Sequence, residues 1–384
     1  MFVCPSLAGA GVERRVCTLL EHLISENIAV RLGLLRMEGE FLDRVPASRL
    51  IFAASNQSSK RVLLKLFRSR DLVNSLVAIA QIRTMLREFE PDIVVTFTLE
   101  STIPMYFVVR SGQGGEVAWI ISEDSNTAVA SNGICGSALL GRIVQTLLGR
   151  IYRKSSHVSC VSTSVVNSVR AIYRVDRFRL GRISNPVDIE IVENAIRNGR
   201  NSFVDRDYIL AVGRLVRIKQ FDLLIRAFAE VRKSHRVQLL ILGEGPERRN
   251  LNELIDGYGL QNDVLLPGFV QNPWNYMAQS KLLVLTSKHE GFGNVIVEAM
   301  AVGCPVVATR CGGPEDLIRH EENGLLVGQD RQEVADAIRF LLDDPEAAQR
   351  LADQARVDVE QYTPDKITRK FVALLEQVAD QLGR

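Results

Sequence analysis

A chain of 384 residues, 46% hydrophobic and 24% charged, has the length of two globular domains that each bury a core of their own. No run approaches about 18 uninterrupted apolar residues, which excludes a transmembrane helix, and the first residues lack the charged region and cleavage site of a secretory signal. We therefore expect a cytoplasmic protein, which can still associate with the inner face of the plasma membrane.

The net charge of +2 hides an asymmetry. Residues 1–200 hold 25 Lys and Arg against 18 Asp and Glu, a net charge of +7, and the remainder holds 22 against 27, a net charge of −5. A basic first half indicates an anionic partner, such as a membrane surface, a lipid phosphate or a nucleic acid. Nucleic acid is the least favoured, because few aromatic residues stand among the basic ones and no nucleic-acid motif is present.

The six cysteines are scattered and form neither a C-x-x-C motif nor a cysteine–histidine pair at metal-binding spacing. We expect buried, reduced thiols and no metal site. They are Cys4, Cys17, Cys135, Cys160, Cys304 and Cys311.

The first half opens with a short predicted strand over residues 2–7 and a helix over 12–27, joined by Gly9 and Gly11. A strand, a glycine turn and a helix direct free backbone N–H groups toward an anion. Alone this is weak evidence, because Arg14 stands where the G-x-G-x-x-G pattern has its last glycine.

A second strand is predicted over residues 28–35 and a helix over 58–90. A cluster of basic residues marks the start of that helix, which is either an interfacial helix on anionic lipid or a surface helix with an ordinary core stripe. The cluster consists of Lys60, Arg61, Lys65, Arg68 and Arg70.

Further strands follow at 91–97, 117–124 and 157–162, with a helix over 137–153 and another over 165–173 that Ser162 caps. This alternation predicts a doubly wound parallel sheet. The second half repeats the alternation and predicts a second parallel sheet. Its strands are expected at 207–215, 237–245, 263–269, 281–287, 305–310 and 323–327, and its helices at 220–234, 246–258, 273–279, 294–302 and 331–342.

The polar stretch between the two series reads as a linker. We place the first domain at residues 1–188, the linker at 189–206 and the second domain at 207–362. Residues 363–384 form an amphipathic helix that is expected to pack back toward the first domain.

The stretch from 284 to 300 is the centre of the second half. A strand breaks at a glycine loop beginning with Glu290, and a helix starts at Asn294, so N–H groups and the helix dipole face an anion. Glu290 and Glu298 bracket this loop, and a carboxylate beside an anion site favours a hydroxylated partner such as a sugar. Alternatively, Glu298 is a solvated helix residue and Glu290 a partner of the dipole.

Four loops of the second half follow strands and should meet at one sheet edge. Arg214 and Lys219 follow the first strand and could grip a diphosphate, although two solvated loop cations are the simpler alternative. The tight turn with Gly243 and Gly245 lets a flat ring approach the backbone. The loop from Glu290 and the loop 312–315 complete the set.

The segments that carry these loops, GRLVRIKQFDLLIRAF, LLILGEGPE, LPGF, LLVLTSKHEGFGNVIVEAMAVGCPVVATRCGGPEDLI and NGLLV, resemble the nucleotide-sugar domain of retaining glycosyltransferases of family four. The resemblance covers nearly all of residues 207–342. In the first half, PSLAGAGVERRV and ISNPVD resemble the family more loosely. The family's GT-B fold has two Rossmann-like domains, each with a doubly wound parallel sheet, facing each other across a cleft.

The resemblance implies roles for these residues. Arg214 and Lys219 hold the donor diphosphate, and Glu290 binds hydroxyls of the transferred sugar. Further contacts come from the backbone of Phe292, Gly293, Asn294 and Val295 to sugar or phosphate, from Glu298 to the ribose, from Gly243 and Gly245 near the base, and from Gly9 and Gly11 to the diphosphate.

One feature departs from the family. Many members carry a histidine after the strand that corresponds to 117–122, whereas this chain has Glu123 and Asp124 there. We expect Glu123 or Asp124 to line the acceptor side.

The sequence offers no evident protein nucleophile and no Asp-x-Asp metal motif at a strand end. With these absences, the resemblance implies a retaining, metal-independent hexosyltransferase that needs no cofactor. It also implies a UDP-sugar as the default donor and a lipid-linked glycan as the acceptor in bacterial cell-surface polysaccharide or lipopolysaccharide synthesis. Two alternatives remain: a glycoside hydrolase that uses Glu290 and Glu298, and a non-catalytic binding module of the same fold.

Overall fold

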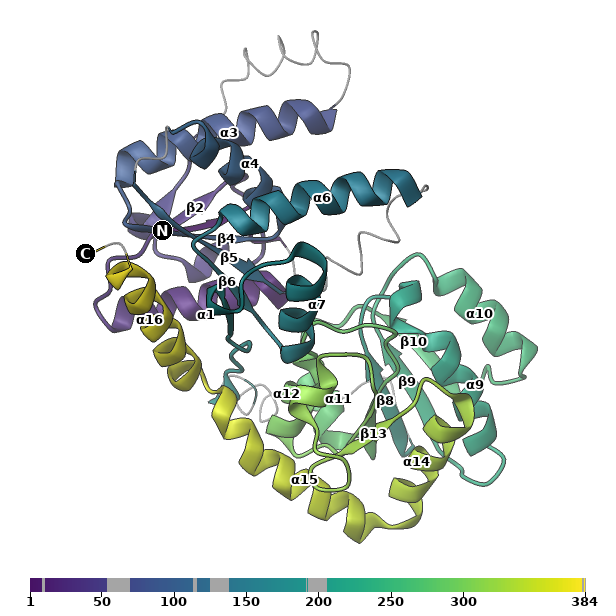
Figure 1. Ribbon diagram of the computed structural model, residues 1–384. Coiled ribbons are helices and arrows are strands. Elements are labelled where there is room, and N and C mark those ends of the chain that lie inside the picture. Colours follow the sequence, from purple (N-terminus) through teal and green to yellow (C-terminus); the bar gives the residue numbers. More distant parts are fainter. Residues whose placement is uncertain are drawn as a thin grey trace. The chain divides into compact units, whose positions relative to one another are not determined.

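The computed structural model describes residues 1–8, 11–53, 70–112, 116–124, 138–190, 192, 206–381 and 383. The chain forms two compact units, Met1–Pro186 together with Pro364–Arg384, and Val187–Thr363. Each unit contains its own sheet and its own buried core (Figure 1).

The first unit is built on a seven-stranded sheet in the order β3-β2-β1-β4-β5-β6-β7, with every neighbouring pair parallel. The central strands are continuous buried apolar runs, as expected of a sheet covered on both faces. The strands are β1 Phe2–Cys4, β2 Leu32–Leu34, β3 Leu50–Ile51, β4 Ile93–Phe97, β5 Ala118–Glu123, β6 His157–Cys160 and β7 Leu180–Arg182.

Helices connect these strands. They are α1 Gly11–Ser25, α3 Arg70–Phe89, α4 Leu99–Arg110, α6 Ala138–Lys154 and α7 Thr163–Tyr173, with short 3-10 turns η1 Leu42–Arg44, η2 Ala47–Arg49 and η3 Arg177–Arg179. The predicted cap is confirmed, because the Ser162 hydroxyl accepts a hydrogen bond from the Val165 N–H at 3.3 Å. Lys60, Arg61, Lys65 and Arg68 lie outside the described residues, so the nature of that basic cluster stays a prediction.

The sequence analysis missed α4. Pro104 stands inside this helix, and a proline normally argues against a helix at its position. Much of the helix surface is also buried, so the sequence lacks the alternation of apolar and polar faces that marks an amphipathic helix.

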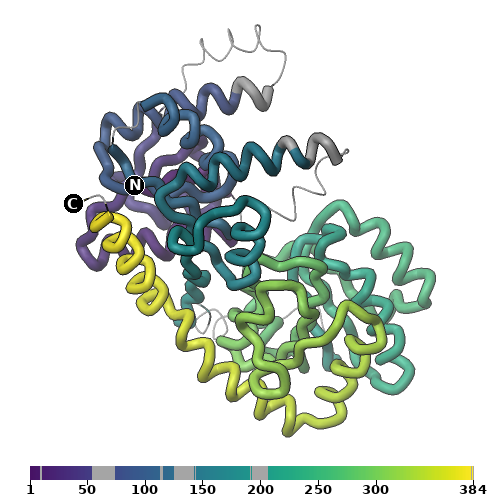
Figure 2. Tube along the Cα trace, in the orientation of Figure 1, coloured from purple at the N-terminus to yellow at the C-terminus, as the bar shows by residue number. Residues whose placement is uncertain are grey.

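The last helix, α16 Pro364–Asp380, belongs to the first unit. It packs against α1, and Figure 2 shows this yellow helix beside the purple start of the chain. The fully buried Phe371 ring meets the Phe2 ring edge-on, with centroids 5.7 Å apart.

The second unit has a six-stranded parallel sheet in the order β10-β9-β8-β11-β12-β13. Its strands are β8 Tyr208–Val212, β9 Gln238–Leu242, β10 Val264–Gly268, β11 Leu282–Leu285, β12 Val306–Thr309 and β13 Leu325–Val327. Its helices are α9 Phe221–Val231, α10 Arg248–Gly257, α11 Trp274–Gln279, α12 Asn294–Val302, α13 Pro314–Leu317, α14 Arg331–Asp343 and α15 Pro345–Val359, with turns η4 Arg217–Lys219 and η5 Glu360–Tyr362.

Both predicted parallel sheets are confirmed. In each sheet the order of the strands reverses beside the first strand, between β1 and β4 and between β8 and β11. Loops at the carboxyl ends of those strand pairs therefore frame the usual ligand position of such folds.

The five described cysteines, Cys4, Cys17, Cys160, Cys304 and Cys311, are buried free thiols as expected, and Cys135 lies outside the described residues. Over the same described part of the chain, every helix is too short or too polar to cross a bilayer.

Replacing Phe371 by Ala should lower the free energy of unfolding of the first unit by about 3–5 kcal/mol, because a fully buried ring leaves a cavity against Phe2. Urea denaturation measures the change. The matched control is Val357→Ala on α15. Val357 is 66% exposed, so this substitution should change the free energy of unfolding by less than about 0.5 kcal/mol. Equal effects of the two substitutions would contradict the packing of α16.

Candidate active site

Four loops of the second unit lie together at the carboxyl edge of its sheet. They follow β8, β9, β11 and β12, which are consecutive neighbours in the sheet. Backbone hydrogen bonds join them in pairs: Leu215 N to Glu244 O at 2.9 Å, Lys288 N to Ile218 O at 2.7 Å, and Glu290 N to Cys311 O at 2.9 Å. The four loops predicted to meet at one sheet edge do so.

Glycines make this close contact possible. A Cβ added at Gly243 would lie 1.9 Å from the Gly213 carbonyl oxygen, and φ of Gly243 is 150°. A Cβ at Gly245 would lie 2.4 Å from the Leu215 oxygen, and one at Gly313 would lie 2.4 Å from the Phe292 oxygen. The backbones therefore touch where side chains would hold them apart.

Lys219 and Glu290 are brought together. The Lys219 Nζ lies 2.6 Å from the Glu290 Oε2, and the Lys219 and Glu290 side chains are 23% and 19% exposed. Ser287 Oγ donates to the same Oε2 at 3.0 Å, whereas Oε1 has no partner within the described residues. Glu290 Oε2 is thus held by two protein donors, and Glu290 Oε1 is available to a ligand.

The peptide that carries Lys219 is also fixed. Thr286 Oγ1 donates to the carbonyl oxygens of Lys219 and Gln220, both at 3.1 Å. Thr286 directly follows β11, so the loop after β8 is tied to the end of the neighbouring strand. The ammonium position is therefore set by two adjacent strands.

Arg214 lies in the same loop as Lys219. The Lys219 stem passes over Gly213, with its Cε 3.4 Å from where a Gly213 Cβ would stand. The Arg214 side chain is exposed and makes no ion pair with any residue that the structure describes. A guanidinium without an internal carboxylate, in the same loop as a fixed ammonium, can meet the oxygens of a phosphate.

The glycine loop leads into α12 as predicted, and the helix spans the expected residues. Gly293 has a φ of 100° and precedes Asn294, and no side chain caps this helix start. Phe292 is buried, Val295 is half-buried in the first turn, and Glu298 is half-buried one turn further along the helix. Asn294 and Glu298 both make contacts within the protein.

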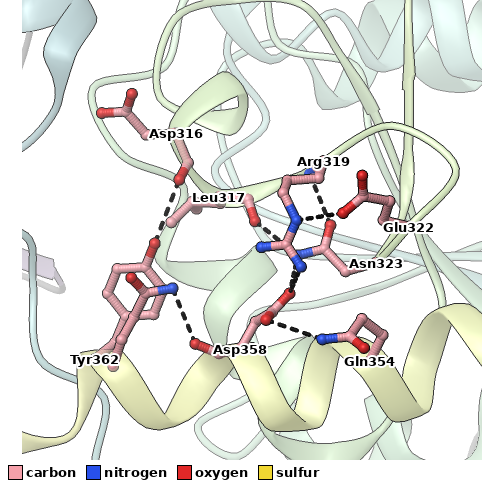
Figure 3. Close-up of polar contacts among 9 residues, drawn as sticks. Asp316, Leu317, Arg319, Glu322, Asn323, Gln354, Asp358 and Tyr362 are labelled. Atoms are coloured by element: carbon pink, nitrogen blue, oxygen red, sulfur yellow. Dashed lines mark hydrogen bonds and ion pairs between the residues drawn. The ribbon is translucent and has the colours of Figure 1, made fainter.

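The segment after β12 is held by Asp358 of α15 and Tyr362 of η5, contacts that were not predicted from the sequence. Asp358 Oδ2 accepts hydrogen bonds from Asn323 Nδ2 at 2.7 Å and from Arg319 Nη2 at 2.8 Å (Figure 3). The Tyr362 hydroxyl donates to the Asp316 carbonyl at 3.4 Å, and its ring meets the Phe292 ring edge-on at 5.7 Å. Together these contacts hold the 312–323 segment against the glycine loop.

Cys311 lies beside the Glu290 carboxylate. Burial raises the pKa of the Cys311 thiol to about 12, with a further rise from the negative charge of Glu290. The thiol is therefore protonated at neutral pH and unsuited to act as a nucleophile.

In the first unit, Gly11 begins α1, as expected for the predicted glycine turn, and Gly9 lies outside the described residues. The buried Arg15 of α1 forms an ion pair with Asp124, and its guanidinium donates to Ser122 Oγ at 3.1 Å and to the Ile183 carbonyl at 3.3 Å. The sequence analysis missed this pair, and a separation of 109 residues gives no local signal for it.

Glu123, the neighbour of Asp124, is buried and accepts a hydrogen bond from the Tyr152 hydroxyl. Both carboxylates at the end of β5 are therefore engaged by the first unit itself. An acceptor role for either one stays a prediction. Among all the residues that are described, no group of three or more His, Cys, Asp or Glu could hold a metal ion.

The substitution Gly243→Ala should lower the free energy of unfolding of the second unit by at least about 2 kcal/mol, because the new Cβ meets the Gly213 oxygen and the backbone is strained. The same substitution at Gly257 in α10, where a Cβ has open space, is the control and should be neutral or stabilising by up to about 1 kcal/mol. Urea denaturation of both variants decides, and equal stabilities would contradict the close contact of the two loops.

The sequence comparisons divide the chain in two. Residues 9–191 match the family "Glycosyltransferase Family 4", and residues 192–358 match "Glycosyl transferases group 1". A curated protein of Campylobacter jejuni, N-acetylgalactosamine-N,N'-diacetylbacillosaminyl-diphospho-undecaprenol 4-alpha-N-acetylgalactosaminyltransferase, is 26% identical over 96% of this chain and 97% of its own. The lipopolysaccharide core biosynthesis glycosyltransferase LpsD of Rhizobium meliloti is 28% identical over 70% of each chain.

Solved structures share the fold. Anabaena HepE in complex with UDP and glucose superposes with a TM-score of 0.79 at 20% identity, covering 98% of each chain. Sucrose-phosphate synthase of Thermosynechococcus elongatus superposes with a TM-score of 0.80 at 20% identity, also over 98% of each chain. With a family 4 domain followed by a group 1 domain, each built on a parallel sheet, the chain belongs to the glycosyltransferases of the GT-B fold.

Proposed function

We propose that this glycosyltransferase moves a hexose or N-acetylhexosamine, with retention of configuration, from a UDP-sugar to a lipid-linked glycan of bacterial lipopolysaccharide or another cell-surface polysaccharide. The observation that carries the proposal is the Lys219–Glu290 pair at the meeting point of four loops, with Arg214 in the same loop as Lys219. The two cations can bind the diphosphate of a nucleotide sugar, and the carboxylate oxygen that has no protein partner can accept a hydrogen bond from the sugar.

In this proposal the donor diphosphate lies against Arg214 and Lys219. The sugar reaches Glu290, whose Oε1 accepts a hydroxyl while Ser287 and Lys219 hold Oε2. Secondary contacts come from the backbone of 292–295 to sugar or phosphate, from Glu298 to the ribose, and from Gly243 and Gly245 near the base. The uncapped start of α12 favours negative charge at that place.

The chemical step would be supported mainly by stabilisation of the leaving group. A departing nucleoside diphosphate gains negative charge, and each preorganised donor contributes on the order of 3 kcal/mol in the transition state. We propose front-side transfer through an oxocarbenium-like state, in which the donor phosphate helps to take the proton of the acceptor. No protein nucleophile, metal ion or cofactor is invoked.

The donor and acceptor are proposed from the relatives. The Campylobacter jejuni relative is named for a diphospho-undecaprenol substrate, and LpsD for lipopolysaccharide core biosynthesis. HepE has been solved with UDP and with UDP-glucose. We place the Gly9–Gly11 loop near the donor diphosphate, the acceptor near Glu123 or Asp124, and the protein at the inner face of the plasma membrane.

Two other functions are compatible with the sequence. A glycoside hydrolase acting through Glu290 and Glu298 would release sugar without a nucleotide donor, and no relative named above is a hydrolase. A binding module would take up the donor without turnover. Assays with and without the nucleotide sugar separate all three activities.

Saturating UDP should stabilise the protein against thermal unfolding. A ligand at 100 times its dissociation constant adds about 2.7 kcal/mol to the folded state. Differential scanning fluorimetry with UDP, GDP, ADP and CDP at equal concentrations measures the effect. A larger shift with another nucleotide would replace UDP as the proposed donor base, and no shift with any of them would contradict the donor site.

Arg214→Ala or Lys219→Ala should lower kcat at least about a hundredfold, since each removes a cation that meets the leaving diphosphate. Product formation is followed by proton NMR, which also reports the anomeric configuration. The control is Arg249→Ala on α10. The Arg249 side chain is 88% exposed, so its removal should leave the rate unchanged. Near-normal rates in both site variants would refute the leaving-group role.

The same assay tests metal independence, because a chelator added to the unsubstituted enzyme should then leave its rate intact. A rate restored only by a divalent cation would instead assign part of the charge stabilisation to a metal.

A further inference from the structure

Basic side chains converge on a pocket of the first unit that is separate from the loops described above. The pocket has a volume of about 310 Å³ and is lined by Tyr106 and Arg110 of α4 and by Arg150, Arg153 and Lys154 of α6. The two helices pack beside each other in the same unit (Figure 1). Four cations therefore face one space.

The topology places this pocket away from the expected substrate edge. In a parallel sheet each connecting helix runs opposite to its strands, so the end of the helix lies at the strands' amino edge. Arg110 is the last residue of α4, and Lys154 is the last residue of α6. The pocket is thus at the opposite edge from Asp124 and the Gly11 turn, which follow strands.

Most of these cations are not neutralised by the protein. Arg110, Arg150 and Lys154 are exposed and make no ion pair with any residue in the described ranges. The segment 138–154 contains no acidic residue at all. By contrast, exposed arginines elsewhere commonly have a carboxylate, as in Arg249 with Glu253 and Arg319 with Glu322.

The helix ends do not account for these charges either. Carbonyl groups at the end of a helix attract cations. At the end of α6, however, Arg179 already donates hydrogen bonds to these carbonyls, to that of Arg153 at 3.0 Å and to that of Ser155. Arg153 in turn donates to the Tyr173 carbonyl at 2.6 Å. At the end of α4, Ser111 Oγ donates to the Val108 carbonyl at 2.8 Å.

Apolar side chains stand next to the cations. Phe107 is 41% exposed and lies one helical turn before Arg110, and Leu147 is 39% exposed and lies one turn before Arg150. Residues three apart share a helix face, so each helix presents an apolar and a basic side chain together. A surface with both kinds of side chain matches the boundary between phosphate headgroups and acyl chains.

We propose that the pocket between the ends of α4 and α6 binds the phosphate of an anionic phospholipid headgroup at the membrane surface, with Phe107 and Leu147 directed to the acyl region. Arg110, Arg150 and Lys154 supply the charge, and the Tyr106 hydroxyl, which has no hydrogen-bond partner among the described residues, supplies a neutral donor. This site gives the proposed membrane partner a defined place, and it binds lipid whether or not the transfer reaction proceeds as proposed.

The test is partition of the full chain onto vesicles of phosphatidylcholine with phosphatidylglycerol, measured by co-sedimentation. The double variant Arg110→Gln/Arg150→Gln should bind about thirtyfold more weakly, since each cation at an anionic surface contributes about fivefold. The matched control Arg369→Gln/Lys370→Gln removes the same charge from exposed positions of α16 and should lose less than about threefold. A thermal melt checks that both variants fold, and Lys154→Gln alone, expected to lose about fivefold, replaces the double variant if it does not.

A loss below about threefold in the pocket variant, or an equal loss in the control, would overturn the proposal, as would equal binding of the unsubstituted chain to vesicles of phosphatidylcholine alone. Inorganic phosphate, titrated calorimetrically, distinguishes the sources of the anion. Phosphate binding that the pocket variant abolishes while vesicle binding persists would assign the pocket to a free anion and not to lipid. Donor turnover with a soluble acceptor should be unchanged in the pocket variant, so a failure here leaves the proposed reaction testable on its own.

Discussion

The ion pair between Lys219 and Glu290 is the contact on which the geometry of the candidate site depends. It joins the loops after β8 and β11, the two strands between which the sheet order reverses. Each side chain is only about a fifth exposed, so the attraction between the two charges is offset by the cost of removing both from water. Its importance is positional: it holds an ammonium and a carboxylate at the place where a parallel sheet offers its ligand site.

Backbone packing makes that position reproducible. Gly243, Gly245 and Gly313 each bring one loop into direct contact with the backbone of its neighbour, so the loops are joined without intervening side chains. Contacts of α15 and η5 with the 312–323 segment add further support. A site that is supported by backbone contacts and hydrogen bonds within the protein is largely formed before a ligand arrives. Such preorganisation is what electrostatic stabilisation of a leaving group needs.

The sequence specified the parts of this arrangement that have local signals. Helix α12 occupies the predicted residues because a glycine loop and a regular apolar spacing mark both its start and its face. Helix α15 was missed although Asp344 and Pro345 form a clear start signal, because its buried positions are mostly alanines. The Arg15–Asp124 pair could not be foreseen, since no local pattern records a contact between distant residues. The chemical roles of Arg214, Lys219, Glu290 and Glu298 stay predictions, because proximity does not establish a role.

Charged side chains at the two edges of the first sheet differ in whether the protein supplies partners for them. At the carboxyl edge, two carboxylates have partners within the unit. Asp124 forms an ion pair with Arg15, and Glu123 accepts a hydrogen bond from Tyr152. At the amino edge, Arg110, Arg150 and Lys154 stay uncompensated. These three cations are exposed at the amino end of the strands, and the six residues of β5 span about 20 Å to the other end. If the lipid headgroup binds at the amino edge, the reacting sugar of a membrane-bound acceptor must reach the carboxyl edge, several sugar units away from the lipid surface. The proposed headgroup site therefore favours acceptors that already carry an oligosaccharide over a bare lipid phosphate.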